Sequence, residues 1–180
     1  MEKQKDEEFF KEAIVVLYPD IYRFVRSITK DTYVAQDVAQ NTMEKAWKNL
    51  HQLRDRSKAK SWVFQIARNE STGVFRNAKY EESFDEPDGE MSYERIGGVG
   101  DDILEILLRK ERNSLLVRAL DMLSPRHKEL VKLWALGDLS QKEIAEVLQI
   151  NYNTARVTLY RGLKELRDIY FALERGDFDE

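Results

Sequence analysis

Residues 140–162 read SQKEIAEVLQINYNTARVTLYRG, which is the pattern of a short helix joined to a second helix by a tight turn. Ser140 and Glu143 have the spacing of a capping box, in which two side chains satisfy backbone N–H groups where a helix begins. Ala145 is small, as it must be where two helices cross closely. The three residues 149–151 suffice for a turn between the helices. The sequence therefore predicts a helix-turn-helix.

The second helix of this motif is predicted to have one buried and one outward face. Asn151 or Asn153 can cap its start. Its buried side is predicted to be Ala155, Leu159 and Leu163. The opposite, polar face fits the major groove of B-DNA, where arginine bonds to guanine O6 and N7, and a helix N-terminus suits a phosphate. We therefore predict contacts with DNA, and an ordinary helical hairpin with a polar face is the alternative. The predicted outward residues are Asn153, Thr154, Arg156, Thr158, Tyr160 and Arg161.

The composition is that of a globular protein. The 180 residues are 42% hydrophobic and contain no cysteine, which excludes disulfides and thiolate-based metal or redox sites. No apolar run is long enough to span a bilayer, and the charged N-terminus has no signal-peptide core. We therefore expect a cytoplasmic protein. No motif indicates a cofactor or a metal.

The net charge of -4 hides an uneven distribution of charge along the chain. Residues 54–79 carry seven basic and two acidic side chains, whereas residues 80–111 carry eleven acidic and three basic ones. The local field, and not the total charge, governs the approach to a polyanion. The basic stretch is compatible with nucleic-acid binding, although charge runs are more often solvated faces.

The N-terminal part of the chain shows apolar residues at helical spacing. A helix over 9–28 is expected to be kinked or divided by Pro19. Asp31 or Thr32 is expected to cap a second helix, and a third helix is expected to cover about 58–79. The predicted inward residues of the third helix are Trp62, Val63, Ile66, Ala67, Val74 and Phe75.

Residues 81–100 interrupt the helical pattern. They contain Pro87, the run Gly-Gly-Val-Gly over 97–100 and many acidic residues, which is the composition of a linker. The predicted fold class is therefore all-α, with two helical domains over 1–80 and 101–180 joined by a flexible acidic linker.

Two separate blocks of motifs carry a family resemblance. Residues 37–40 read DVAQ and residues 61–69 read SWVFQIARN. In the C-terminal part, residues 123–126 read LSPR, residues 143–148 read EIAEVL and residues 153–156 read NTAR. In this order and spacing, the motifs resemble bacterial RNA polymerase sigma factors of the extracytoplasmic-function (ECF) type, within the sigma-70 family. The resemblance covers nearly the whole chain.

The resemblance implies a sigma-two domain over 1–80 and a sigma-four domain over 101–180, joined by the linker. It implies an alternative sigma factor that binds core RNA polymerase, directs it to specific promoters and helps to open them. It further implies a monomer within the holoenzyme and an anti-sigma factor as a partner. The sigma-four helix-turn-helix is then expected to read the minus-thirty-five element.

Two further sets of site residues follow from the resemblance alone. By motif, the polymerase-binding positions are Asp37, Gln40, Asn41 and Glu44. The positions expected to hold the melted minus-ten strand are Arg54, Arg56, Lys58, Lys60, Ser61, Asn69, Phe75, Arg76 and Asn77.

The chain departs from the family pattern at a few positions. Gly73 stands in the third helix where the family often carries aspartate, and it is expected to cost about 1 kcal/mol of helix stability relative to alanine. Met43 replaces a common phenylalanine, and Gln149 replaces a common turn glycine. These departures leave the predicted fold intact.

Other classes of function fit the sequence less well. An enzyme is not expected, because His51 and His127 stand isolated in helical patterns and no catalytic or nucleotide-binding motif is present. A helix-turn-helix regulator that acts on duplex DNA without polymerase is the main alternative, and such a protein typically dimerises on a palindrome. A pure protein-interaction module does not explain Arg156 and Arg161 on the predicted recognition face.

Overall fold

The computed structural model describes residues 2–74 and 114–177, and within these ranges the chain forms helices and no strand. The predicted all-α class is confirmed. The predicted linker over 81–100 lies outside the described residues, and the domain boundaries stay a prediction. The chain divides into two compact units. The first comprises Met1–Glu81 and Lys132–Ile150, and the second comprises Glu82–Val131 and Asn151–Glu180.

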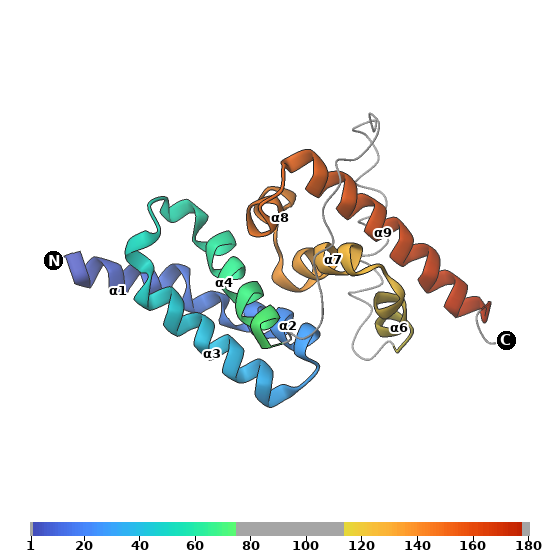
Figure 1. The fold of residues 1–180 in the computed structure, drawn as a ribbon, viewed down its shortest axis with the longest axis horizontal. Coiled ribbons are helices and arrows are strands. Elements are labelled where there is room, and N and C mark those ends of the chain that lie inside the picture. Colours follow the sequence, from blue (N-terminus) through green and yellow to red (C-terminus); the bar gives the residue numbers. More distant parts are fainter. Residues whose placement is uncertain (1, 75–113, 178–180) are drawn as a thin grey trace. The chain divides into compact units, whose positions relative to one another are not determined.

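In the first unit, helices α2 and α4 both pack against α3 (Figure 1). Pro19 lies in the first turn of α2, so the helix predicted over 9–28 is divided there. Proline fits a first turn because its missing N–H has no partner at that position in any helix. The elements are α1 (Glu2–Ala13), η1 (Val15–Leu17), α2 (Tyr18–Thr29), α3 (Thr32–Lys48), η2 (Leu50–Gln52), η3 (Arg56–Lys58) and α4 (Ala59–Val74).

The core of the first unit includes the fully buried rings of Phe24 and Phe64, whose centroids lie 5.7 Å apart. The sequence did not predict Phe64 as inward, and Trp62, which it did predict, is half-buried. The difference arises because α4 packs against α2, α3 and α8 (Gln141–Leu148), so more than one face of α4 is covered. A single apolar stripe therefore understates the buried surface of this helix.

Local signals fix several helix ends. Asp31, one of the two predicted caps, is the N-cap of α3. Helix α7 (Pro125–Gly137) begins with a proline and ends at a glycine. Proline is favoured in the first turn of a helix and glycine at its end. A Cβ on Gly137 would lie only 2.8 Å from Phe64 Cε1, so a side chain there would displace the buried ring.

The second unit contains α6 (Ser114–Met122) packed against α9 (Tyr152–Arg175). His127 on α7 approaches α9 closely, because a Cβ on Gly162 would lie 3.1 Å from the His127 Cβ. The imidazole Nδ1 of His127 contacts the Glu165 carboxylate. The local sequence around His127 gives no sign of this partner, because Glu165 lies 38 positions along the chain.

Gly73→Ala is expected to raise the free energy of unfolding by up to about 1 kcal/mol, because alanine loses less backbone entropy on entering a helix. A Cβ at this position in α4 would meet no atom within 4 Å, so no clash offsets the gain. Urea unfolding at unchanged slope measures the difference. Gly162→Ala is the matched control and is expected to destabilise the protein, since its Cβ meets His127. A Gly73→Ala variant of equal or lower stability contradicts the prediction.

Candidate nucleic-acid interface

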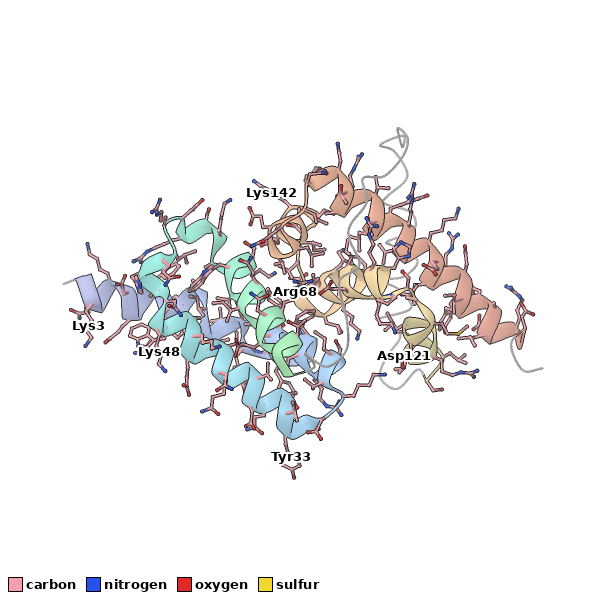
Figure 2. The ribbon with its side chains drawn as sticks, viewed as in Figure 1. Lys3, Tyr33, Lys48, Arg68, Asp121 and Lys142 are labelled. Carbon is pink, nitrogen blue, oxygen red and sulfur yellow. The ribbon has the colours of Figure 1, made fainter. Side chains whose placement is uncertain are left out.

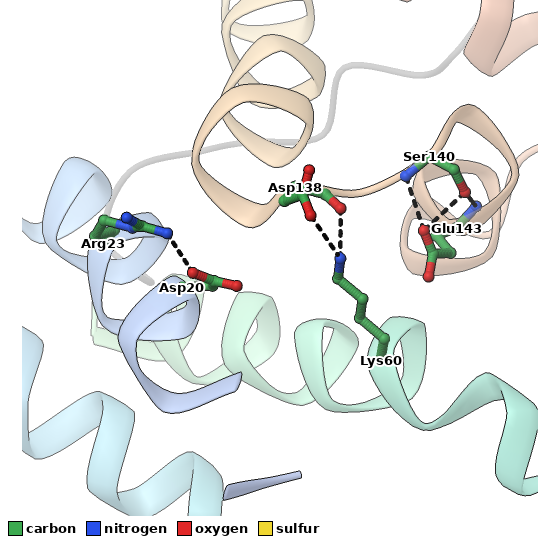
Figure 3. Close-up of polar contacts among 6 residues, drawn as sticks. All are labelled: Asp20, Arg23, Lys60, Asp138, Ser140 and Glu143. Carbon is green, nitrogen blue, oxygen red and sulfur yellow. Dashed lines mark hydrogen bonds and ion pairs between the residues drawn. The ribbon is translucent and has the colours of Figure 1, made fainter. Parts of the chain in front are cut away.

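Helices α8 and α9 are connected by three residues, and the start of α8 carries the predicted capping box. The Glu143 carboxylate accepts the backbone N–H of Ser140 at 2.8 Å, and Ser140 Oγ accepts the backbone N–H of Glu143 at 3.3 Å (Figure 3). These bonds use donors that have no partner inside the helix, so they fix the residue at which α8 begins.

The connection between the two helices is equally well defined. Gln149 ends α8 in the left-handed conformation with φ of 56°. The backbone N–H of Ile150 then donates to the carbonyl of Ala145 at 3.0 Å. Asn151 caps α9 by accepting the N–H of Thr154 at 2.7 Å. The predicted helix-turn-helix is therefore confirmed.

The predicted outward face of α9 is only partly outward. Asn153 and Arg161 are exposed and Tyr160 is half-buried. Thr154, Arg156 and Thr158 are buried, with exposed fractions of 2%, 8% and 4%. The prediction that these three side chains face solvent is wrong.

The physical reason is that α9 is enclosed on more than one side near its start. All six residues from Thr154 to Leu159 are buried, including Val157 at 5% exposed. A helix that packs on one neighbour buries only every third or fourth residue, so six in succession require cover from several directions. A prediction from the polar pattern assumes a single buried stripe, so it cannot reveal that α9 is covered on several sides.

The basic stretch before α4 presents its charges to solvent at one end and to protein at the other. Arg54, Arg56 and Lys58 are exposed, Lys60 is half-buried and Ser61 is 3% exposed. Asp55 caps η3, and hydrogen bonds from the side chain and backbone of Ser57 lower the pKa of the Asp55 carboxyl. Asn69 is exposed on α4. Three predicted minus-ten residues lie outside the described residues: Phe75, Arg76 and Asn77.

Carboxylates of the first unit engage part of this basic stretch. Ser61 Oγ donates to Glu146 Oε2 at 2.6 Å, and Lys58 Nζ lies 3.2 Å from Glu146 Oε1. The hydrogen bond from Ser61, aided by Lys58, holds the pKa of Glu146 below its ordinary value although partial burial acts in the opposite direction. Lys60 donates to the carbonyl of Asp138 and lies 3.5 Å from its carboxylate (Figure 3). Side chains expected to hold DNA thus hold acidic groups of the same chain.

Arg56 is engaged in a different way. Its guanidinium contacts the Asp6 carboxylate and lies 4.4 Å from the centroid of the Phe9 ring, both on α1. The pair is exposed, so its contribution to stability is small. It nevertheless links the basic stretch to the N-terminal helix.

The face of α3 that carries the predicted polymerase-binding residues is open. Asp37, Gln40, Asn41 and Glu44 are all exposed. The opposite face of the helix is buried through Ala35, Val38, Ala39, Thr42 and Ala46. Helix α3 therefore turns one side to the core and offers the other, which is polar and acidic, to a partner.

The described residues lack two other kinds of functional element. They contain no group of three or more histidine, cysteine or acidic side chains that could hold a metal ion. None of the described helices is long and apolar enough to cross a membrane.

Comparison with known proteins identifies the family. Residues 14–80 match the model of sigma-70 region 2, and residues 114–166 match that of sigma-70 region 4. The ECF RNA polymerase sigma factor SigM of Bacillus subtilis is 30% identical over 162 residues, which are 89% of this chain and 93% of SigM. The chain belongs to the ECF sigma factors. The RNA polymerase sigma factor SigV of the same organism is likewise 30% identical, over 82% of each chain.

Solved structures agree with the fold of this sigma factor. The sigma factor RpoE in complex with the anti-sigma factor NepR from Bartonella quintana has a TM-score of 0.63 at 21% identity, covering 89% of this chain and 95% of that one. The structure of CnrH in complex with the cytosolic domain of CnrY has a TM-score of 0.61 at 19% identity, covering 94% and 90%.

As an alternative sigma factor, the protein binds core RNA polymerase, directs it to promoters and helps to open them. The predicted family and function are thereby confirmed. The sequence did not indicate that Glu146 and Asp138 contact the basic stretch of this sigma factor. No sequence signal could have shown it, because Ser61 and Glu146 lie 85 positions apart and each is an ordinary polar residue in its own helix.

Proposed function

We propose that this sigma factor divides promoter recognition between its two predicted domains. Residues 1–80 bind the core enzyme and the melted minus-ten strand, residues 81–100 join the domains, and residues 101–180 read the minus-thirty-five element. The observation that carries the first assignment is the exposure of Asp37, Gln40, Asn41 and Glu44 along one helix.

The minus-ten strand binds along the basic stretch that leads into α4. Opening DNA costs a few kcal/mol of unstacking per base. A positively charged surface offsets part of this cost by attracting the phosphates of the opened strand. The residues proposed for this role are Arg54, Arg56, Lys58, Lys60, Ser61, Asn69, Phe75, Arg76 and Asn77.

The minus-thirty-five duplex is read by the N-terminal part of α9. Asn153 and Arg161 are already exposed, and Tyr160 is half-exposed. Thr154, Arg156 and Thr158 are buried, so they can contact DNA only after the segments that cover this part of α9 have moved away. Reading by these residues therefore follows a change of conformation.

The surroundings of the protein follow from this role. The polymerase forms the RNA, and the sigma factor itself makes no bond, so no catalytic residue is assigned. The protein works in the cytoplasm as a monomer within the holoenzyme. The two solved structures named above are complexes, one with the anti-sigma factor NepR and the other with the cytosolic domain of CnrY. We include an anti-sigma factor among the partners of this chain.

The test of the proposal is complex formation with sigma-free core RNA polymerase from the native host. Gel filtration is expected to show one copy of the chain co-eluting with core, and the complex is expected to bind a promoter that neither component binds alone. A chain that binds duplex DNA but forms no complex with core contradicts the proposal and indicates a conventional helix-turn-helix regulator.

Glu146→Gln is expected to increase the affinity of the free chain for a single-stranded minus-ten oligonucleotide by up to about fivefold, as an exposed ion pair contributes about 0.2–1 kcal/mol. The substitution frees Lys58 from its carboxylate partner while keeping an acceptor for Ser61. Fluorescence anisotropy at low salt measures the change. Glu174→Gln, which changes the net charge equally on the exposed end of α9, is the control. Equal gains in both variants contradict the specific contact.

A further inference from the structure

Tyr33 has an unusual environment for an aromatic residue. Its side chain is 81% exposed, more than any other large hydrophobic side chain in the described part of the chain. Figure 2 shows it at the N-terminal end of α3, pointing away from the neighbouring helices of its unit. A single exposed apolar residue is ordinary on a protein surface. The position of Tyr33 on α3 gives it further meaning.

Tyr33 continues the polymerase-binding face of α3. Tyr33, Asp37, Gln40 and Glu44 follow one another at intervals of four, three and four residues, which places them in one stripe along the helix. The buried residues of α3 lie on the other side. The exposed ring is therefore aligned with the residues that the family assigns to core binding, although the family motif itself begins only at Asp37.

The backbone of Tyr33 is held rigidly. Asp31 Oδ1 accepts the N–H groups of Tyr33 at 2.8 Å and of Val34 at 3.0 Å, which caps the helix at this point. A ring on a fixed backbone has only two side-chain torsions to lose on binding, so it adds contact area at low entropic cost.

The identity of the residue is not explained by the helix. The first turn of a helix favours acidic or small polar side chains, which interact with its N–H groups and dipole. Tyrosine offers neither interaction and has only moderate helix propensity. By contrast, tyrosine is enriched among the few residues that dominate the binding energy of protein interfaces.

We infer that Tyr33 is an anchor of the interface with core RNA polymerase. This inference rests on the proposed function of the α3 face. The ring packs into a shallow apolar site on the polymerase, and Asp37 and Glu44 in the same stripe face basic groups beside that site. A base of the melted strand is a less suitable occupant, because both carboxylates of the stripe repel phosphates.

The experiment compares equilibrium binding of fluorescently labelled, full-length variants to core polymerase. Tyr33→Ala is expected to weaken binding by more than about fivefold, the loss that separates the minority of important interface residues from the rest. Tyr33→Phe is expected to bind within about twofold of the original chain, because the ring supplies most of the contact area. Val16→Ala, which truncates a 61% exposed side chain on η1, is the control and is expected to leave binding unchanged.

The outcomes separate this inference from the function on which it rests. Gln40→Ala is included because it is expected to weaken core binding if α3 docks on the polymerase. Loss of affinity in Gln40→Ala with none in Tyr33→Ala overturns the role of Tyr33 and leaves the proposed function standing. Absence of binding by the original chain overturns the proposed function. If Tyr33→Ala binds core normally but loses a single-stranded minus-ten oligonucleotide, the ring stacks on DNA and the inference is wrong.

Discussion

Arg156→Ala is expected to weaken binding of the minus-thirty-five duplex by the holoenzyme by about 1–3 kcal/mol, the discrimination that one bidentate contact between arginine and guanine supplies. Alanine at this position has no donor for guanine O6 and N7. We expect this loss of affinity on the cognate promoter, and we expect the loss to be smaller on a promoter in which the contacted base pair is replaced. Binding to a series of promoters with single substitutions in the element measures both effects.

Two variants identify the kind of contact. Arg156→Lys keeps the charge but loses the planar pair of donors, so it is expected to recover only part of the affinity that Arg156→Ala loses on the cognate sequence. Arg161→Ala removes an exposed cation from the same helix and serves as the comparison. If Arg156→Ala weakens binding equally on every sequence, and Arg156→Lys restores it, the side chain contacts a phosphate and reads no base.

The burial of Arg156 adds a condition to this prediction. With 8% of its surface exposed, the side chain cannot reach a base edge in the conformation described. Exposing the Arg156 side chain costs free energy that the DNA contacts must offset. The apparent affinity of the chain for DNA is therefore reduced in proportion to the fraction of molecules in which Arg156 is exposed. Binding measured in the holoenzyme therefore reports on Arg156 more directly than binding by the free chain.

Features that depend on near neighbours in sequence were predicted correctly. Ser140 was predicted as an N-cap, and Asp31 and Asn151 were each one of two predicted candidates. All three act on backbone groups two or three residues away, so the sequence contains the whole interaction. The division of the first helix at Pro19 has the same local cause. The family motifs then supplied a function that helix periodicity alone does not contain.

Features that depend on distant segments were not predicted. The burial of Thr154, Arg156 and Thr158 depends on how many sides of α9 are covered, which a pattern of apolar residues does not record. The contact of Ser61 with Glu146 joins two ordinary polar residues far apart in the chain. The exposure of Tyr33 was likewise overlooked, because the family motif directs attention to the polar positions after it.

Phe64→Ala is expected to lower the free energy of unfolding by about 3–5 kcal/mol, because it removes a fully buried ring and leaves a cavity. The ring lies against Phe24 and beside Gly137, so a collapse that fills the cavity would have to move two other helices. Phe64→Leu nearly conserves the volume and is expected to cost less than about 1.5 kcal/mol. Urea unfolding followed by circular dichroism measures both variants.

Trp62→Ala provides the decisive comparison, since the sequence pattern places Trp62 inward and the structure leaves it half-buried. A half-buried ring loses less transfer free energy and leaves a shallower cavity when it is removed, so Trp62→Ala is expected to cost clearly less than Phe64→Ala. If Trp62→Ala instead cost more than Phe64→Ala, the apolar pattern of the sequence would describe the packing of α4 better than its contacts with α2, α3 and α8 do. The stability of α4 also bears on function, because the residues from Arg54 to Asn69 that are assigned to the minus-ten strand are carried by this helix and the segment before it. Their positions depend on the core that Phe64 fills.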